Sequence, residues 1–300
     1  MFATSLPITP QPRKPLFALL LSFVLPGFGQ LYNGQINKAL WLFLIFTLIT
    51  VPLLAVIALY VPSTLMLPTL ILSLIAVLVT WIYSLYDAWS TAKQKPEYLL
   101  KPWQYKSTYL LIFIVCNLII LPTLINYVRA YKVESLYIPS TSMNPTLEQG
   151  DILFADKRYN CNGCKPVERG DVAIFNYPND RTKYYIKRVI ALPNDQVELK
   201  GQEIIINGKT LLQTTTPNQQ NILATEKIEN ATWQVLWNNT EGFSPSTFTV
   251  PAGQVFVLGD NRNQSTDSRN FGMVPMPDIV GKAKQLWYAK DWSRLGQVIH

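Results

Sequence analysis

The stretch GDVAIFNYP, Gly170 to Pro178, opens on a Gly-Asp turn and continues as a short run of β-branched and aromatic residues. A similar stretch, GDILFADKR, begins at Gly150. Both are typical of a turn followed by a β-strand. Further strand-like runs follow them: KYYIKRVIAL, DQVELKG, EIIINGK, GQVFVLGD and DIVGKAKQLWYA. Short strands at this spacing predict a β-rich domain over residues 131–300, which is long enough for a core of its own.

The part of the chain before this domain is largely apolar. No charged residue lies between Lys38 and Asp87, and this run can supply two helices of about 20 residues each. The uncharged run from Ser107 to Val128 can supply one more. We therefore expect membrane spans near residues 39–60, 65–86 and 108–128.

The first apolar run, PLFALLLSFVLPGFG from Pro15, differs because a Pro-Gly pair interrupts it after about half the length that a bilayer needs. It could be a signal-peptide-like segment, a re-entrant piece or a short tilted helix, and we expect the mature protein to keep it. The phrase LPGFGQLYNGQINKA resembles a signature of small multi-helix membrane domains. It is equally typical of a tight, glycine-rich helix break.

The basic residues predict the orientation. The loop from Ser90 to Lys106 carries four lysines against Glu97 alone, which marks it as cytoplasmic and places the residues after Arg129 outside. This arrangement favours three spans, with the segment 15–28 re-entrant or lying on the surface. Four spans with an external N-terminus is the alternative.

We thus predict a membrane-anchored, mainly β protein with three regions. Residues 1–106 form a multi-helix membrane region with a cytoplasmic loop, 107–130 a transmembrane anchor, and 131–300 an extracytoplasmic domain. Residues from about 210 to 246, rich in Asn, Gln and Thr, suggest an inserted smaller subdomain within the last region.

The net charge of +7 does not indicate a nucleic-acid partner. Residues 131–300 hold 18 Lys and Arg against 17 Asp and Glu, so +6 of the charge belongs to the apolar first part. Basic residues that flank apolar runs are topology signals, and no basic face with interleaved aromatics follows them.

Two of the three cysteines, Cys161 and Cys164, form a lone C-x-x-C pair. A tetrahedral metal site would need two more ligands, which are not obvious in the sequence. On the exported side of a membrane we expect a local disulfide, with a redox-active pair as the alternative. No metal site is predicted.

Histidine chemistry is excluded because the single histidine is His300. Ser-His-Asp and Cys-His arrangements and H-E-x-x-H metal sites therefore cannot form. A serine or threonine nucleophile with a desolvated lysine as base remains. Lys187 suits this role, because strand alternation puts it on one face with Tyr185 and Val189 while Arg188 points the other way.

Four motifs follow the last predicted span in a fixed order, within residues 138–275: IPSTSMNPTL, RGDVAIFNYP, YYIKRVIALPNDQV and GDNRNQSTDSRNFGMVP. Together they resemble the signature boxes of the bacterial type I signal peptidases. These are membrane-anchored serine/lysine endopeptidases that remove signal peptides from exported proteins. The resemblance does not cover residues 1–106, and the helices expected there exceed the family's usual one or two spans.

The resemblance implies that Ser142 is the nucleophile and Lys187 its general base, acting through an acyl-enzyme. It also implies that the backbone N–H of Ser142 and the hydroxyl of Ser140 bind the oxyanion.

The last motif adds supporting residues by the same resemblance. Ser265 matches a serine that orients the lysine, and Asp267 and Arg269 match a charge pair that holds the site together. Asn263 and Gln264 depart from the family's usual GDNRDNS, which puts one supporting contact in doubt.

The implied substrates are preproteins with small residues, usually Ala, at the first and third positions before the cut. The phospholipid bilayer is a second implied partner and the export translocon a further candidate, whereas no metal or organic cofactor is implied. The expected location is the bacterial cytoplasmic (inner) membrane, multi-pass, with a periplasmic catalytic domain.

Two competing functions were weighed. A soluble SOS-type autoprotease shares the dyad, but it would carry a DNA-binding N-terminus and no spans. A membrane scaffold with a degenerate peptidase domain would carry the spans without activity.

Overall fold

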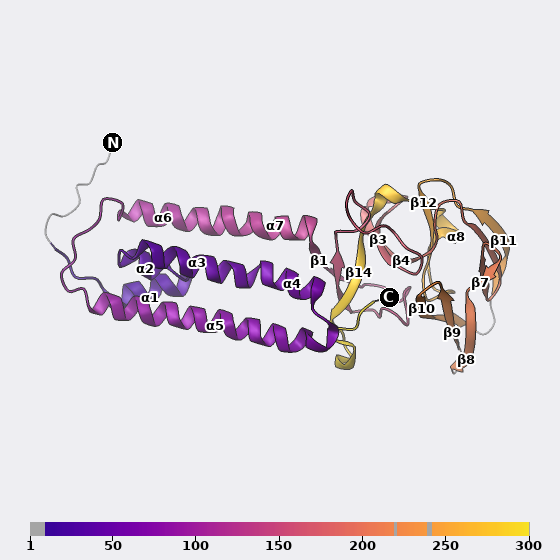
Figure 1. The fold of residues 1–300 in the computed structure, drawn as a ribbon, viewed down its shortest axis with the longest axis horizontal. Helices are drawn as coiled ribbons and strands as arrows, with labels where there is room; N and C mark the ends of the chain where they lie inside the picture. The colour runs from indigo at the N-terminus through magenta and orange to yellow at the C-terminus, as the bar shows by residue number, and fades with distance from the viewer. Residues whose placement is uncertain (1–9, 219–220, 239–241, 300) are drawn as a thin grey trace. The chain divides into compact units, whose positions relative to one another are not determined.

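The computed structural model describes residues 10–218, 221–238 and 242–299 (Figure 1). The chain divides into two compact units. We call Met1–Val61 with Leu65–Arg129 the helical unit, and Pro62–Thr64 with Ala130–His300 the β unit.

The helical unit consists of helices joined by short turns. They are α1 (Pro15–Val24), α2 (Phe28–Tyr32), α3 (Ile36–Thr50), α4 (Pro52–Tyr60), α5 (Ser63–Lys93), α6 (Lys106–Ile114), the π-helical η1 (Val115–Ile120) and α7 (Leu121–Tyr131). Two prolines explain the interruptions, because proline lacks an N–H and its ring clashes with the preceding turn. Pro52 separates α3 from α4, and Pro122 lies two residues after the end of the π-helical segment.

Three stretches are long and apolar enough to cross a membrane by length and composition: Ile36–Tyr60, Thr64–Lys93 and Lys106–Tyr131. They contain the three predicted spans. Helix α1 has only 10 residues and ends before Gly27, whose φ of 97° favours glycine and allows the tight turn into α2. The glycine-rich phrase therefore does form a helix break.

A buried polar cluster ties this break to α5. The amide of Gln30 is fully buried and donates to the carbonyl oxygen of Ser84 at 2.8 Å and to Asp87 at 3.0 Å. Asp87 also pairs with Lys38 at 2.5 Å. The two charges that bracket the uncharged run therefore neutralise each other, which lowers the cost of placing them among apolar helices.

The β unit is built on a seven-stranded antiparallel sheet with the order β1-β2-β14-β3-β4-β12-β13. Its strands are β1 (Val133–Tyr137), β2 (Ile152–Asp156), β3 (Val172–Tyr177), β4 (Asp180–Ala191), β12 (Gln254–Leu258), β13 (Val274–Pro275) and β14 (Ile279–Tyr288). The short helices α8 (Ser268–Phe271), η2 (Met276–Asp278) and η3 (Trp292–Arg294) complete this part. The β-rich character predicted from the sequence is confirmed.

Two smaller sheets lie between β4 and β12 in the chain. One has the order β11-β5-β6-β7 and the other β10-β9-β8. Their strands are β5 (Gln196–Gly201), β6 (Glu203–Ile206), β7 (Lys209–Thr210), β8 (Leu212–Asn218), β9 (Asn221–Ile228), β10 (Ala231–Asn238) and β11 (Phe243–Thr249). Residues 219–220 and 239–241 of the expected insertion lie outside the described residues.

Strand β3 shows how the main sheet is covered on both faces. Val172 and Ile174 pack into one apolar cluster, and Ala173 and Phe175 into another on the opposite face. All four are at most 1% exposed. A strand buried on both faces is a rigid support, and its neighbour β4 carries Lys187.

Candidate active site

The turn that follows β1 carries Ser142 and is anchored by two buried apolar residues. Met143 is 2% exposed and Leu147 is fully buried, and both pack under the main sheet. The N–H of Leu147 donates to the carbonyl oxygen of Met143 at 2.9 Å. Burial of these two side chains fixes the conformation of the turn and therefore the position of Ser142.

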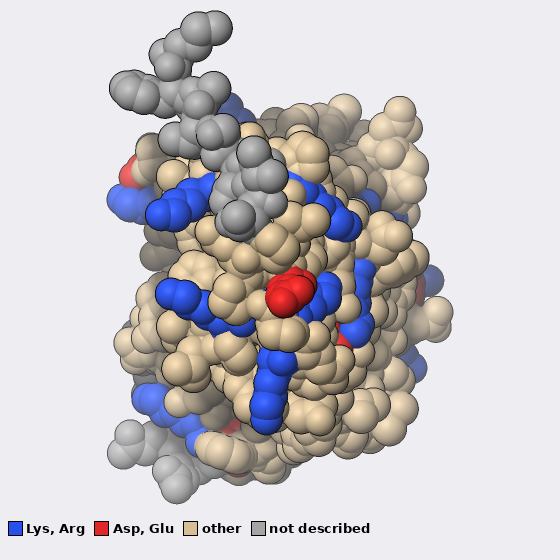
Figure 2. Space-filling view, turned by 90° about the vertical axis from the view of Figure 1, so that its left-hand side faces the viewer, with Lys and Arg blue, Asp and Glu red and all other residues tan. Residues whose placement is uncertain are grey.

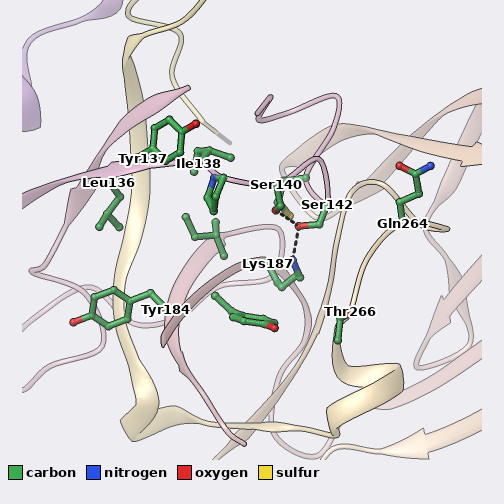
Figure 3. A pocket seen from close by; sticks show the side chains of 13 residues that line it. Leu136, Tyr137, Ile138, Ser140, Ser142, Tyr184, Lys187, Gln264 and Thr266 are labelled. Carbon is green, nitrogen blue, oxygen red and sulfur yellow. Dashed lines mark hydrogen bonds between the residues drawn. The ribbon is translucent and has the colours of Figure 1, made fainter. Parts of the chain in front are cut away.

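Lys187 reaches Ser142 from β4. Its Nζ lies 2.6 Å from the Oγ of Ser142, although 45 residues separate them in the chain (Figure 3). Lys187 is 4% exposed and lies beside Tyr185 and Val189, as strand alternation predicted. The hydrogen bond holds a hydroxyl and an amine within the distance that proton transfer requires.

The surroundings of Lys187 favour its neutral form. Burial lowers the pKa of Lys187 from 10.5 to about 8, because an ammonium ion loses its hydration there. The carboxylates of Asp267 and Asp260 partly offset this effect, and the Arg269 cation adds to it. A neutral amine accepts a proton, so the site favours Lys187 as a general base near neutral pH.

Ser140 lies beside the nucleophile. Its Oγ is 3.2 Å from the Oγ of Ser142, and its side chain is exposed (Figure 3). A hydroxyl at this place can rotate to donate to an oxygen that develops charge next to Ser142, as an oxyanion donor must.

The loop that follows β12 forms hydrogen bonds with the turn that carries Ser142. The backbone N–H of Asn261 donates to the carbonyl oxygen of Ser142, and its Nδ2 donates to that of Thr141, both at 3.1 Å. The sequence analysis missed Asn261. Because one residue fixes two successive carbonyl groups, it sets the backbone of Ser142 relative to the sheet.

A buried ion pair supports this loop from the other face of β4. Arg188 and Asp260 are fully buried and form a bidentate pair, with distances of 2.8 and 2.7 Å. Thr146, from the nucleophile turn, donates to Asp260 at 2.5 Å. The sequence analysis assigned no role to this pair. Strand alternation predicts only that Arg188 lies on the face of β4 opposite Lys187.

Asp267 and Arg269 form the expected charge pair. Nε and Nη2 of Arg269 each lie 2.7 Å from a different oxygen of Asp267, which is fully buried. Asp267 also caps α8 and accepts from the backbone N–H of Gly259 at 3.0 Å. This carboxylate therefore fixes both ends of the loop that runs from residue 259 to 267.

Ser265 is the site residue whose contacts differ from the expectation. Its Oγ is buried and has no hydrogen-bond partner among the described residues, so no bond to Lys187 is present. The side chain packs against Gly259, where a Cβ would also lie 2.5 Å from the carbonyl oxygen of Ser142. Ser265 thus lies next to the dyad, and its orienting role stays a prediction.

A cavity of about 480 Å³ opens beside the dyad. Figure 3 shows Leu136 and Tyr184 on one side of Lys187, and Gln264 and Thr266 on the other. Residues of β1 and of β4 both line this cavity. Three strands separate β1 from β4 in the sheet order, so the sheet must curve to bring them together.

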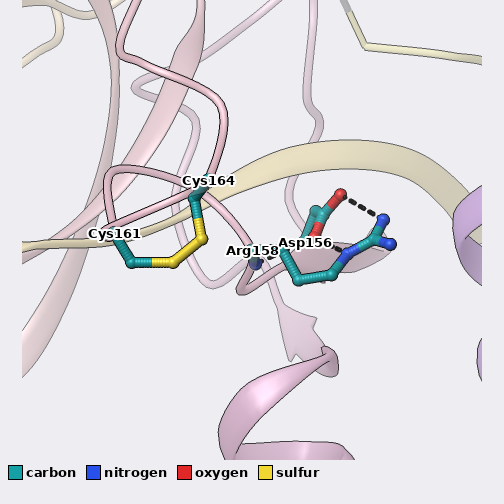
Figure 4. Close-up of a disulfide and its surroundings, with 4 residues drawn as sticks. All are labelled: Asp156, Arg158, Cys161 and Cys164. Atoms are coloured by element: carbon teal, nitrogen blue, oxygen red, sulfur yellow. Dashed lines mark hydrogen bonds and ion pairs between the residues drawn. A yellow bond between two sulfur atoms is a disulfide. The ribbon is translucent and has the colours of Figure 1, made fainter.

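Cys161 and Cys164 lie in the loop between β2 and β3, away from the dyad in the chain. Their sulfur atoms are bonded, with Cα atoms 4.9 Å apart (Figure 4). Arg158 donates to Asp156 near this loop through its Nε at 3.0 Å and its backbone N–H at 2.9 Å. The loop is tied locally and contributes no group to the cavity.

Comparisons with known proteins identify the family of this chain. The model of the family "Signal peptidase, peptidase S26" matches residues 107–288. Signal peptidase I of Pseudomonas aeruginosa is 34% identical over 209 residues, which cover 57% of this chain and 73% of that protein. Probable signal peptidase I-1 of Synechocystis sp. is 34% identical over 207 residues, which cover 65% of this chain and 89% of that protein.

A crystal structure of a signal peptidase I from Enterococcus faecalis is 27% identical, covers 39% of this chain and 97% of that chain, and has a TM-score of 0.29. The family model alone spans more than half of the chain and contains all four motifs around the dyad. The chain therefore belongs to the signal peptidase family, peptidase S26, and is a serine endopeptidase.

Proposed function

We propose that this protein removes signal peptides from preproteins by a Ser142–Lys187 dyad at the outer surface of the bacterial cytoplasmic membrane. The observation that carries the proposal is the distance of 2.6 Å between Nζ of the buried lysine and Oγ of the serine. Family membership supports the substrate class.

Acylation begins when neutral Lys187 takes the hydroxyl proton of Ser142 and Oγ attacks the scissile carbonyl carbon. The carbonyl oxygen becomes an oxyanion, to which the backbone N–H of Ser142 and the hydroxyl of Ser140 donate. Each such donor is worth about 3 kcal/mol of transition-state stabilisation. The Lys187 ammonium then gives its proton to the leaving amine, the C–N bond breaks and an ester on Ser142 remains.

Deacylation uses the same groups in the same order. Lys187 takes a proton from water, and the hydroxide attacks the ester carbon under the same two donors. The C–Oγ bond then breaks, Oγ takes the proton back from Lys187, and the signal peptide leaves with a free carboxylate.

The free edges of two strands support an extended substrate. Among the described strands β1 pairs only with β2, and residues 184–187 of β4 pair only with β3 because the ladder to β12 begins at Arg188. A peptide lying between these edges can add as a strand and place its scissile bond at Ser142. Small residues, usually Ala, at the first and third positions before the cut would suit the cavity.

The three apolar helices support a multi-pass anchor, with the 94–105 loop in the cytoplasm and the β unit in the periplasm. A reporter fused after Lys101 should report the cytoplasm, and its export would overturn this orientation. Cys161 and Cys164 would then lie on the oxidising side, so that alkylation without reductant should leave both unmodified.

The function is tested with purified full-length protein and a preprotein that carries a signal peptide. The wild type should cleave at a single site, and Ser142→Ala and Lys187→Ala should each abolish cleavage. Ser244→Ala, a change of the same type at an exposed position on β11, is the matched control and should cleave normally. A wild type that leaves the preprotein intact, or a Ser142→Ala variant that still cuts it, would refute the proposal.

A further inference from the structure

A buried arginine of the helical unit has no counter-charge among the residues that the structure describes. Arg13 is 8% exposed, and its guanidinium carbon lies 4.3 Å from the ring centre of Tyr32 and 4.2 Å from that of Tyr98. Its Nε and Nη2 are buried and donate to no atom of the described residues. The buried hydroxyl of Tyr109 also lacks a partner there. A buried cation without a counter-charge is costly, so this arrangement points to an anion that the described residues do not supply.

The acidic residues of this part of the chain do not fill the gap. Residues 1–130 contain only Asp87 and Glu97, and Asp87 is paired with Lys38. Glu97 is exposed and forms no ion pair with Arg13 in the described structure. A guanidinium cannot lose its proton to escape the cost of burial, so an anion from another molecule would lower this cost.

The end of the unit around Arg13 is basic. Figure 2 looks onto the end where residues 94–105 connect α5 to α6, and Lys and Arg side chains gather on this face around an acidic group near its centre. Helix α1 also starts here at Pro15, and no side chain caps its first turn. The exposed N–H groups of a helix N-terminus favour an anion at the same place.

The hollow beside Arg13 is apolar over the rest of its length. It has a volume of about 490 Å³, and its lining begins with Arg13, Lys14 and Pro15 and continues along α1 with Leu16, Phe17 and Leu20. The last three are 72%, 48% and 58% exposed. A site with cations at one end and a bare apolar wall beyond them fits an amphiphile with an anionic head and a hydrocarbon chain.

We propose that the helical unit binds one phospholipid with an anionic headgroup. The phosphate would lie at Arg13, Lys14 and the first turn of α1, and an acyl chain along Leu16, Phe17 and Leu20. This site would be specific, unlike the general contact of the apolar helices with the bilayer, because a buried cation and a shaped wall act together. It does not depend on the peptidase activity of the β unit.

Native mass spectrometry of the full-length protein in a neutral detergent tests the proposal. We expect the wild type to retain one dioleoylphosphatidylglycerol, bound at least about tenfold more tightly than dioleoylphosphatidylcholine, the worth of one charge-assisted hydrogen bond. Arg13→Gln should reduce the affinity for phosphatidylglycerol to that for phosphatidylcholine. Lys93→Gln is the matched control, because this exposed lysine lies over Trp89 and does not line the hollow.

A second variant guards against misfolding of Arg13→Gln. Leu16→Glu changes a 72% exposed residue and should still abolish retention of phosphatidylglycerol, with unchanged circular dichroism. Equal retention of the two lipids, or equal losses in Arg13→Gln and Lys93→Gln, would overturn the proposal. So would displacement of phosphatidylglycerol by inorganic phosphate at equal concentration, because the acyl chain would then add nothing.

Discussion

Replacing Lys187 by Met should stabilise the protein while it abolishes cleavage. Burial lowers the pKa of Lys187 from 10.5 to about 8, and this shift of about 2.5 units corresponds to about 3 kcal/mol at 1.36 kcal/mol per unit. Met keeps the unbranched shape without the charge. Loss of the hydrogen bond to Ser142 offsets about 1 kcal/mol of this stabilisation. The expected gain in the free energy of unfolding is therefore about 2 kcal/mol at pH 6.

The sign of the pH dependence follows from the direction of the shift. Below pH 8 the lysine is charged in both states, so the folded protein carries the full cost of burying an ammonium ion. Between pH 8 and 10.5 the unfolded chain binds more protons than the folded one, so the stability of the wild type rises with pH. Above pH 10.5 the advantage of Lys187→Met should be gone.

Urea unfolding of the full-length protein in detergent, followed by tryptophan fluorescence at pH 6 and pH 10.5, measures this difference. Lys200→Met makes the same change at an exposed position on β5 and should alter the free energy by less than about 0.5 kcal/mol at either pH. If Lys187→Met were no more stable than the wild type at pH 6, or its advantage were the same at both values, the argument from desolvation would be wrong.

Three further predictions concern the supports of the dyad. Gly259→Ala should lower kcat by about 100-fold, because the new Cβ would overlap Ser265 and shift the backbone of the nucleophile turn; a variant with wild-type kcat would contradict this. Asp260→Asn should lower the free energy of unfolding by about 3 to 5 kcal/mol, since it removes the carboxylate that pairs with the fully buried Arg188, and urea titration would detect it. The rate of cleavage should fall as pH decreases through about 8, where Lys187 gains a proton, and a rate that is flat from pH 6 to 9 would exclude it as the base.

The local parts of the site were predictable from the sequence. Period-two alternation placed Lys187 and Arg188 on opposite faces of one strand, and the single terminal histidine left a lysine as the remaining base. The long apolar helices followed from charge-free runs for the same reason: each depends on neighbours within one element. Even Asp87 and Lys38, which bracket one such run, were visible as its limits.

The long-range contacts were not predictable in the same way. Asn261 holds the carbonyl oxygen of Ser142 across 118 intervening positions of the chain, and no periodicity relates two loops. The bond from Ser265 to the lysine was expected by resemblance alone, and the structure does not contain it. A resemblance transfers the identity of a residue, whereas the rotamer of a small side chain depends on the packing of its own loop.

The buried basic side chains of this chain fall into two groups, those that have a counter-charge and those that do not. Four basic side chains among the described residues are less than 9% exposed: Arg13, Lys187, Arg188 and Arg262. Arg188 and Arg262 each face a buried carboxylate and serve the fold. Lys187 and Arg13 form no ion pair in the described structure. Whether each side chain can lose its proton then decides which role we propose for it. An amine can give up its proton, which favours Lys187 as the proposed base, whereas a guanidinium cannot, which favours the proposed anion at Arg13.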